Sequence, residues 1–172
     1  MTTLSREFLD IKKRLTEMSS ENKRVRIYPE RLTADDLDGT AEIEKLCFGA
    51  QAWSKNSLEL LTKEGIGMGM VCHKDGRIVA YGGMLCVVDE GQITNIATHP
   101  DYRRQGYGEA VVESLKKFAK NNRLDVITLE VRESNVAAIK LYTSCGFKVD
   151  GKRKDFYTKP TESAVLMSCK IK

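Results

Sequence analysis

The chain has 172 residues, 41% of them hydrophobic, which suits one globular domain with a sizeable core. Lysine and arginine (28) only slightly outnumber aspartate and glutamate (24), and this mild excess suits an anionic ligand but is too small to indicate a nucleic-acid-binding surface. No apolar run is long enough to span a bilayer, and the N-terminus has no apolar signal core. We therefore expect a cytoplasmic protein that binds neither nucleic acid nor membrane.

The cysteines are scattered and include no Cys-x-x-Cys pair: Cys47, Cys72, Cys86, Cys145 and Cys169. Their odd number and their spacing argue against a disulfide framework and a zinc site, so we expect reduced core thiols. Neither His73 nor His99 has a cluster of ligands or a spacing that pairs it with Cys145. No metal and no cysteine nucleophile are therefore expected.

The first 24 residues are expected to form a separate N-terminal unit. Apolar residues recur there at alternating spacings of four and three: Leu4, Phe8, Ile11, Leu15 and Met18. This periodicity predicts an amphipathic helix, followed by a polar linker at residues 19–23. The helix either packs on its own domain or forms the seam of a homodimer, because the pattern is too short to predict a coiled coil.

The main domain, residues 25–172, is expected to begin with a strand and two helices. The strand is predicted from Val25, Ile27 and Tyr28. A helix that ends near Gly49 is predicted from the apolar stripe Ile43, Leu46 and Cys47. Ser54 is the predicted N-cap of a second helix, with Trp53 packing before it and with two inward-facing residues, Leu58 and Leu61.

Strands and helices then alternate. Residues 67–72 and 78–88 predict a hairpin around the Asp75-Gly76 pair, because Asp-Gly suits positive φ. A strand at residues 92–98, a helix from residue 106 to about 121 and a strand at 126–131 follow. A helix at 136–145, capped by Ser134 or Asn135 and closed by Gly146, and a final hairpin complete the chain. This order predicts an α/β (α+β three-layer) unit, with an antiparallel front half and one parallel strand–helix–strand crossover.

The turn within residues 95–108 has the properties of an anion site at a helix N-terminus. Gly106 and Gly108 carry no Cβ, so a phosphate can approach the backbone N–H groups, and Arg103 and Arg104 add side-chain donors. A pyrophosphate is the predicted ligand. The spacing matches neither the Walker loop nor the dinucleotide Gly-x-Gly-x-x-Gly fingerprint, and the loop alone also fits a simple turn that starts a helix.

Three polar residues of the crossover are candidates for chemistry. Glu130 lies near the carboxyl end of a central strand, where open sheets bind ligands, although its alternation with apolar neighbours also fits an ordinary solvated face. Asn135 and Tyr142 are seven residues apart, so they share one helix face and a single ligand can contact both. A tyrosine in this place also commonly packs in the core.

Several motifs, taken in order, resemble those of the GNAT-type N-acetyltransferases. They are Arg103 to Gly108, Leu129 to Arg132, Ser134-Asn135-x-Ala137-Ala138-Ile139, Leu141-Tyr142 and Gly146-Phe147. Within that superfamily the chain looks most like the bacterial ribosomal-protein-alanine N-acetyltransferases. The motifs shared with that group are Asn95-Ile96-Ala97, His99 to Tyr102, Arg104-Gln105-Gly106, Trp53-Ser54 and Phe156-Tyr157.

The resemblance implies a mostly antiparallel mixed sheet in which a central parallel strand pair splays around the pantetheine arm of acetyl-CoA. It implies cofactor contacts from the strand residues Ile96, Ala97 and Thr98, from the loop residues Arg103, Arg104, Gln105, Gly106, Tyr107, Gly108 and Glu109, and from Asn135. Glu130 would be the general base, directly or through water, and Tyr142 the general acid for the departing thiolate. A phenol of ordinary pKa would suffice, and no acyl-enzyme would be needed.

The expected acceptor is a primary amine, and we favour the N-terminal α-amine of a protein such as a ribosomal protein. An α-amine with a pKa of roughly 7.8 is about one-seventh neutral at pH 7, whereas a lysine is less than about 0.1% neutral. Three features depart from the family pattern: Ala52 in place of a proline, Ser163 in place of an aspartate, and residues 1–24 without a counterpart. The acceptor therefore stays open between a protein N-terminus, a lysine and a small amine, and a non-catalytic acetyl-CoA-binding module is the rival function.

Overall fold

The computed structural model describes residues 26–172, so the predicted N-terminal helix lies outside the described residues. Within them, one seven-stranded sheet has the order β1-β2-β3-β4-β5-β7-β6. The strands are β1 (Glu30–Arg31), β2 (Gly67–Lys74), β3 (Arg77–Val87), β4 (Glu90–Thr98), β5 (Val126–Arg132), β6 (Lys148–Thr158) and β7 (Thr161–Lys170). Only β4 and β5 pair in parallel, as predicted from the crossover, and the other neighbours are antiparallel.

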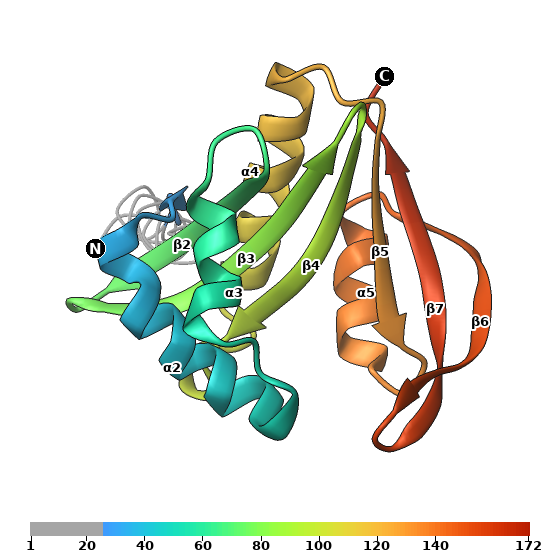
Figure 1. Cartoon of the computed structure of the whole chain (residues 1–172), viewed down its shortest axis with the longest axis horizontal. Helices are drawn as coiled ribbons and strands as arrows, with labels where there is room; N and C mark the ends of the chain where they lie inside the picture. The colour runs from blue at the N-terminus through green and yellow to red at the C-terminus, as the bar shows by residue number, and fades with distance from the viewer. Residues whose placement is uncertain (1–25) are drawn as a thin grey trace, which may run out of the picture.

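Helices cover both faces of the sheet (Figure 1). On one face lie α2 (Leu37–Phe48) and α3 (Lys55–Glu59), which pack their apolar side chains on a core that includes Tyr81 and Ala97. On the other face lie α4 (Tyr107–Asn121) and α5 (Val136–Ser144), over a larger core. Short 3₁₀ turns occur at Ala34–Asp36, Gly49–Gln51, Leu60–Thr62 and Pro100–Tyr102. The predicted three-layer class is confirmed.

The parallel pair is short and then separates. β4 and β5 pair at only three positions, the last of which joins Gln92 to Thr128. Beyond these positions the two strands diverge (Figure 1). Thr94 is the extra residue of a register shift between β3 and β4, and such a bulge bends a strand at the point where the divergence begins. One edge of β4 is therefore left without a strand partner from Ile93 onward, which confirms the expected splay.

Local sequence rules predicted most element ends. The carboxyl end of α2 is closed by Gly49 at φ +57°, and the Asp75-Gly76 turn has positive φ at both residues. The Ser54 Oγ accepts a hydrogen bond of 3.2 Å from the Ser57 N–H, which confirms the predicted cap. Among the described residues no helix is both long and apolar enough to cross a bilayer.

The predicted first strand is wrong. Residues 26–29 have no strand structure, and the first strand is Glu30–Arg31, which pairs with Val71 and Met70 of β2. Pro29 offers no backbone N–H to a ladder, so pairing starts only after it. The apolar side chain of Ile27 instead packs against the core beneath α4.

Candidate active site

A groove of about 710 Å³ lies between the carboxyl-terminal half of β4, the start of α4, and α5. It is lined by all of the predicted site residues except Gln105 and Glu130: Ile96, Ala97, Thr98, Arg103, Arg104, Gly106, Tyr107, Gly108, Glu109, Asn135 and Tyr142. Segments that are distant in the sequence are therefore brought together as expected. The end of α2, at Cys47 and Phe48, completes the lining.

The start of α4 presents unused hydrogen-bond donors. The first backbone bond of the helix runs from the Ala110 N–H to the Gly106 carbonyl, at 3.0 Å. Within residues 26–172, no hydrogen bond satisfies the backbone N–H groups of residues 104–109. Donors of this kind at the positive end of a long helix bind phosphate. The geometry therefore fits a diphosphate.

The two glycines of this loop serve different purposes. Gly106 adopts φ +90°, a left-handed conformation that a side chain would strain. Gly108 instead allows close packing, because a Cβ there would lie 3.2 Å from the Leu141 Cδ2 and 3.6 Å from the Thr98 Oγ1. Gly106 thus sets the course of the backbone, and Gly108 lets α4 approach both α5 and β4.

Some polar side chains of the loop line the groove, whereas another bonds within the loop. Arg103 donates from Nε to the Thr98 carbonyl at 3.2 Å, and its Nη2 lies 3.8 Å from the Cys47 Sγ. Arg104 lines the groove. Gln105 does not, because its Nε2 donates to the Asp101 carbonyl at 3.0 Å and so braces the turn. The sequence motif did not distinguish these tasks.

The β4 edge offers backbone groups to a strand-like ligand. Ile96, Ala97 and Thr98 pair with β3 on one side, and their other side faces the groove. The Thr98 carbonyl already accepts hydrogen bonds from the Arg103 Nε and the Cys47 Sγ. The His99 N–H donates to the Val79 carbonyl of β3, and by the alternation of a strand the backbone groups of Ala97 also face β3. A ligand lying along β4 would therefore find its unused backbone partners at Ile96 and at the Thr98 N–H.

Asn135 and Tyr142 face the same groove from α5, as predicted. The Asn135 Oδ1 accepts from the Ala138 N–H at 3.1 Å, so the amide caps α5 and only its nitrogen is oriented to serve a ligand. Tyr142 is buried, with its ring 5.8 Å from that of Phe147. Burial raises the pKa of the Tyr142 phenol above its ordinary value.

Glu130 lies close to the point where β4 and β5 separate, which we call the split, but it does not line the groove. It is two residues beyond Thr128, the last residue of β5 that pairs with β4. Its neighbours Leu129 and Val131 point into the core under α4 and α5, so Glu130 faces the side of α2. There it accepts a hydrogen bond of 3.2 Å from the Gln92 Nε2. Glu130 and Tyr142 therefore approach the split from opposite faces of β5.

A buried carboxylate on α2 was missed by the sequence analysis. Glu44 is fully buried, and it accepts hydrogen bonds from the Trp53 N–H at 2.9 Å, from the Asn95 Nδ2 at 2.8 Å and from the Tyr81 hydroxyl. Burial raises the pKa of this carboxyl, although the three hydrogen bonds oppose the shift. The available signal was its spacing, because Glu44 lies seven residues after the buried Leu37 and so on the same helix face.

Comparisons with known proteins agree with this geometry. The model of the acetyltransferase (GNAT) family matches residues 37–147. A Bacillus subtilis (strain 168) protein, provisionally named a ribosomal protein bS18-alanine N-acetyltransferase, is 38% identical over 135 residues, 77% of this chain and 88% of its own. The Escherichia coli (strain K12) ribosomal protein bS18-alanine N-acetyltransferase is 39% identical over 100 residues, 57% of this chain and 68% of its own.

A crystal structure also supports the assignment. The ribosomal-protein-S18-alanine N-acetyltransferase from Escherichia coli superposes with a TM-score of 0.76 at 32% identity, over 85% of this chain and 94% of that one. This structural match thus agrees with the family match, with the splayed strands and with the unused N–H groups at the start of α4. The chain belongs to the GNAT family and is an acetyl-CoA-dependent N-acetyltransferase.

Proposed function

We propose that this enzyme transfers the acetyl group to the N-terminal α-amine of a protein, by direct attack within a ternary complex. The observation that carries this proposal is the position of Glu130 and Tyr142 on opposite faces of β5, where β4 and β5 separate. An amine and a thioester that meet in the split would each find one of these groups beside it.

The groove supports a specific placement of acetyl-CoA. The diphosphate would accept hydrogen bonds from the backbone N–H groups of residues 104–109, with the Arg104 guanidinium beside it. The pantetheine arm would lie along β4 at residues 96–98, with Ile96 and the Thr98 N–H as its backbone partners, and the Asn135 Nδ2 would donate to it from the far side. This arrangement directs the thioester toward Tyr142.

The chemistry requires no covalent enzyme intermediate. Glu130 takes a proton from the acceptor ammonium, directly or through water, and the neutral nitrogen attacks the thioester carbon. A C–N bond forms, the C–S bond breaks, and the thiolate leaves beside Tyr142. The proton that the nitrogen loses on becoming an amide passes to solvent, and solvent in turn protonates the thiolate. Because burial raises its pKa, the phenol holds its proton and stabilises the thiolate mainly by donating a hydrogen bond.

The acceptor assignment rests on pKa and on the relatives. Deprotonating a lysine instead of an α-amine costs roughly 3.5 kcal/mol more at pH 7, which favours a peptide N-terminus. The two relatives are named ribosomal protein bS18-alanine N-acetyltransferases, one of them provisionally, so a ribosomal protein in the cytoplasm is the favoured acceptor. Ala52 and Ser163, which depart from the family pattern, would adjust which terminus is taken.

The test is mass spectrometry of a peptide panel after incubation with the enzyme and labelled acetyl-CoA. The panel contains Ala-, Ser- and Met-starting peptides, Nα-blocked lysine peptides and polyamines. We expect label on the α-amine of Ala-starting peptides. Label confined to lysine or to polyamines would overturn the acceptor assignment, and the absence of CoA release with any amine would favour a binding module.

A further inference from the structure

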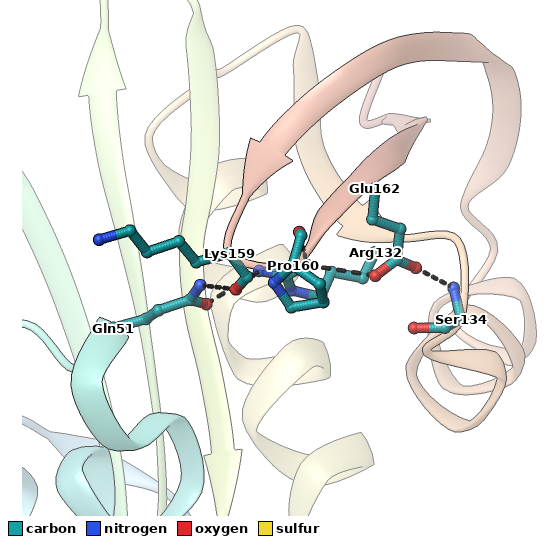
Figure 2. A network of polar contacts seen from close by, with 6 residues as sticks. All are labelled: Gln51, Arg132, Ser134, Lys159, Pro160 and Glu162. Atoms are coloured by element: carbon teal, nitrogen blue, oxygen red, sulfur yellow. Dashed lines mark hydrogen bonds and ion pairs between the residues drawn. The ribbon is translucent and has the colours of Figure 1, made fainter.

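A polar network connects the two sides of the split between β4 and β5, on the sheet face that α2 covers (Figure 2). We call these two sides the arms of the split. Arg132 is its centre. The Arg132 Nη1 donates to the Glu162 Oε2 at 3.1 Å and to the Pro160 carbonyl at 3.3 Å. The Arg132 Nη2 donates to the Gln51 Oε1 at 3.0 Å and to the Lys159 carbonyl at 3.1 Å. One guanidinium on β5 thus binds two separate segments of the chain, Gln51 and the hairpin of β6 and β7.

Further contacts fix this arrangement. The Gln51 Nε2 donates to the Lys159 carbonyl, and the Glu162 Oε1 accepts from the Ser134 N–H (Figure 2). The Arg132 Cζ lies 4.1 Å from the centre of the Tyr157 ring, close enough for a cation–π contact. The pair is well shielded, since the side chains of Arg132 and Glu162 are 20% and 18% exposed. A shielded pair whose two members make further hydrogen bonds holds a geometry that exposed ion pairs do not.

The place of the network in the fold suggests its purpose. Arg132 ends β5 and lies two residues after Glu130, on the same face of the strand. Gln51 ends the 3₁₀ turn that follows α2, so it belongs to the arm that carries β4. Lys159 and Pro160 form the turn between β6 and β7, on the other arm. The contacts from Gln51 to Arg132 and Lys159 therefore span the split on the side where the acceptor would approach Glu130.

We propose that Arg132 is a positioning residue that sets the width of the acceptor entrance by tying Gln51 to the Lys159-Pro160 turn. The inference rests on the proposed function, because it concerns the acceptor end of the same site. A bridge of direct hydrogen bonds leaves no room for bulk between the two arms, so an acceptor must reach Glu130 beside it. The bridge thus favours slender chain ends and disfavours amines with large neighbouring groups. Because Glu162 balances the charge of Arg132, the bridge does not repel an incoming ammonium.

The decisive variant is Gln51→Ala, which removes the bridge and leaves the Arg132–Glu162 pair intact. We expect the KM for an Ala-starting peptide to rise about tenfold, because Gln51→Ala loses both hydrogen bonds that join Gln51 to Arg132 and Lys159, so the entrance is no longer held in place. The kcat and the calorimetric Kd for acetyl-CoA should change less than about twofold, because neither the groove nor Glu130 is touched. Acceptance of Leu- and Phe-starting peptides relative to Ala-starting ones should increase.

Three further variants complete the experiment. Gln51→Glu keeps a side-chain oxygen that can accept a hydrogen bond from Arg132. Compared with Gln51→Ala, it should restore most of the affinity for the peptide substrate. Arg132→Lys retains the charge but cannot fork, so its KM should lie between those of the wild type and Gln51→Ala. Lys55→Ala removes an exposed ion pair with Asp38 at the start of neighbouring α3 and should change nothing.

An unchanged KM and unchanged acceptor preference in Gln51→Ala would overturn the inference. So would a fall in kcat that matches a loss of thermal stability, since that would show a purely structural role. If the wild type instead prefers a lysine or a small amine, the proposed acceptor fails. The comparison is then made with that amine, and a raised KM in Gln51→Ala still supports the bridge.

Discussion

At the scale of single residues, the account depends on two polar groups whose surroundings suit different tasks. Glu130 is half-buried on the face of β5 toward α2 and accepts a hydrogen bond from the Gln92 amide, and the proposed mechanism gives it the incoming amine as a partner. Tyr142 is buried against Phe147 on the other face, and its raised pKa keeps it protonated. In the proposed mechanism, Glu130 would therefore accept a proton while Tyr142 would donate a hydrogen bond.

Substituting Glu130 or Tyr142 should lower kcat without changing the affinity for acetyl-CoA. Glu130→Gln should lower kcat by about 10²- to 10⁴-fold, the usual contribution of a general base, with an unchanged Kd for acetyl-CoA. Tyr142→Phe should lower kcat by a smaller factor of about 10² or less, because only a hydrogen bond to the thiolate is lost. Steady-state kinetics and calorimetry measure both effects. Unchanged turnover in both variants would remove the mechanism.

Glu44 gives a prediction about stability and pH. Because burial raises its pKa, the folded state binds a proton more tightly than the unfolded state does. Its contribution to stability is therefore present below the ordinary value of 4.5 and is lost as the pH rises through the folded pKa. Urea unfolding from pH 4.5 upward should show this fall in the wild type and not in Glu44→Gln.

Other carboxyls should not obscure this effect. The pKa values of Asp36 and Glu162 are lowered, by hydrogen bonds from Thr33 and from Ser134 respectively, so their contributions are lost only as the pH falls. Their window lies below that of Glu44. Identical pH profiles for the wild type and Glu44→Gln would show that burial does not raise the pKa of the Glu44 carboxyl in the fold.

At the scale of elements, the start of α4 carries the backbone donors on which the proposed diphosphate site depends. Six consecutive backbone N–H groups, those of residues 104–109, lack partners within residues 26–172, and the chain turns with positive φ at Arg104 and Gly106 ahead of the helix. The carboxyl-terminal half of β4 then presents the edge along which the rest of that ligand would lie. The cofactor site is therefore mainly a property of the backbone.

A single glycine substitution tests the helix start. Gly106→Val forces a β-branched residue into a left-handed conformation and should displace the donors, so acetyl-CoA binding should be abolished in calorimetry. Gly76→Val is the matched control, because Gly76 has a similar φ of +75° in open space far from the groove. Retained affinity in Gly106→Val, or equal loss in both variants, would show that the loop is not a specific phosphate cradle.

At the scale of the whole molecule, the sequence predicts what is local and misses what is brought together by folding. Helix caps such as Ser54 and the Asp75-Gly76 turn follow from nearby residues, and the motif around Gly106 predicted most of the groove. The first strand was misplaced because apolar residues were counted without regard to Pro29. Neither the burial of Glu44 nor the fork of Arg132 was predicted, because both depend on partners far away in the chain.

The most direct test of the account is a crystal structure of the enzyme with acetyl-CoA bound. The account predicts diphosphate oxygens at about 2.7–3.2 Å from the N–H groups of residues 104–109, with the arm along β4. The thioester carbon should lie in the split between Glu130 and Tyr142. A diphosphate bound away from the start of α4, or a thioester far from both side chains, would contradict the central claim.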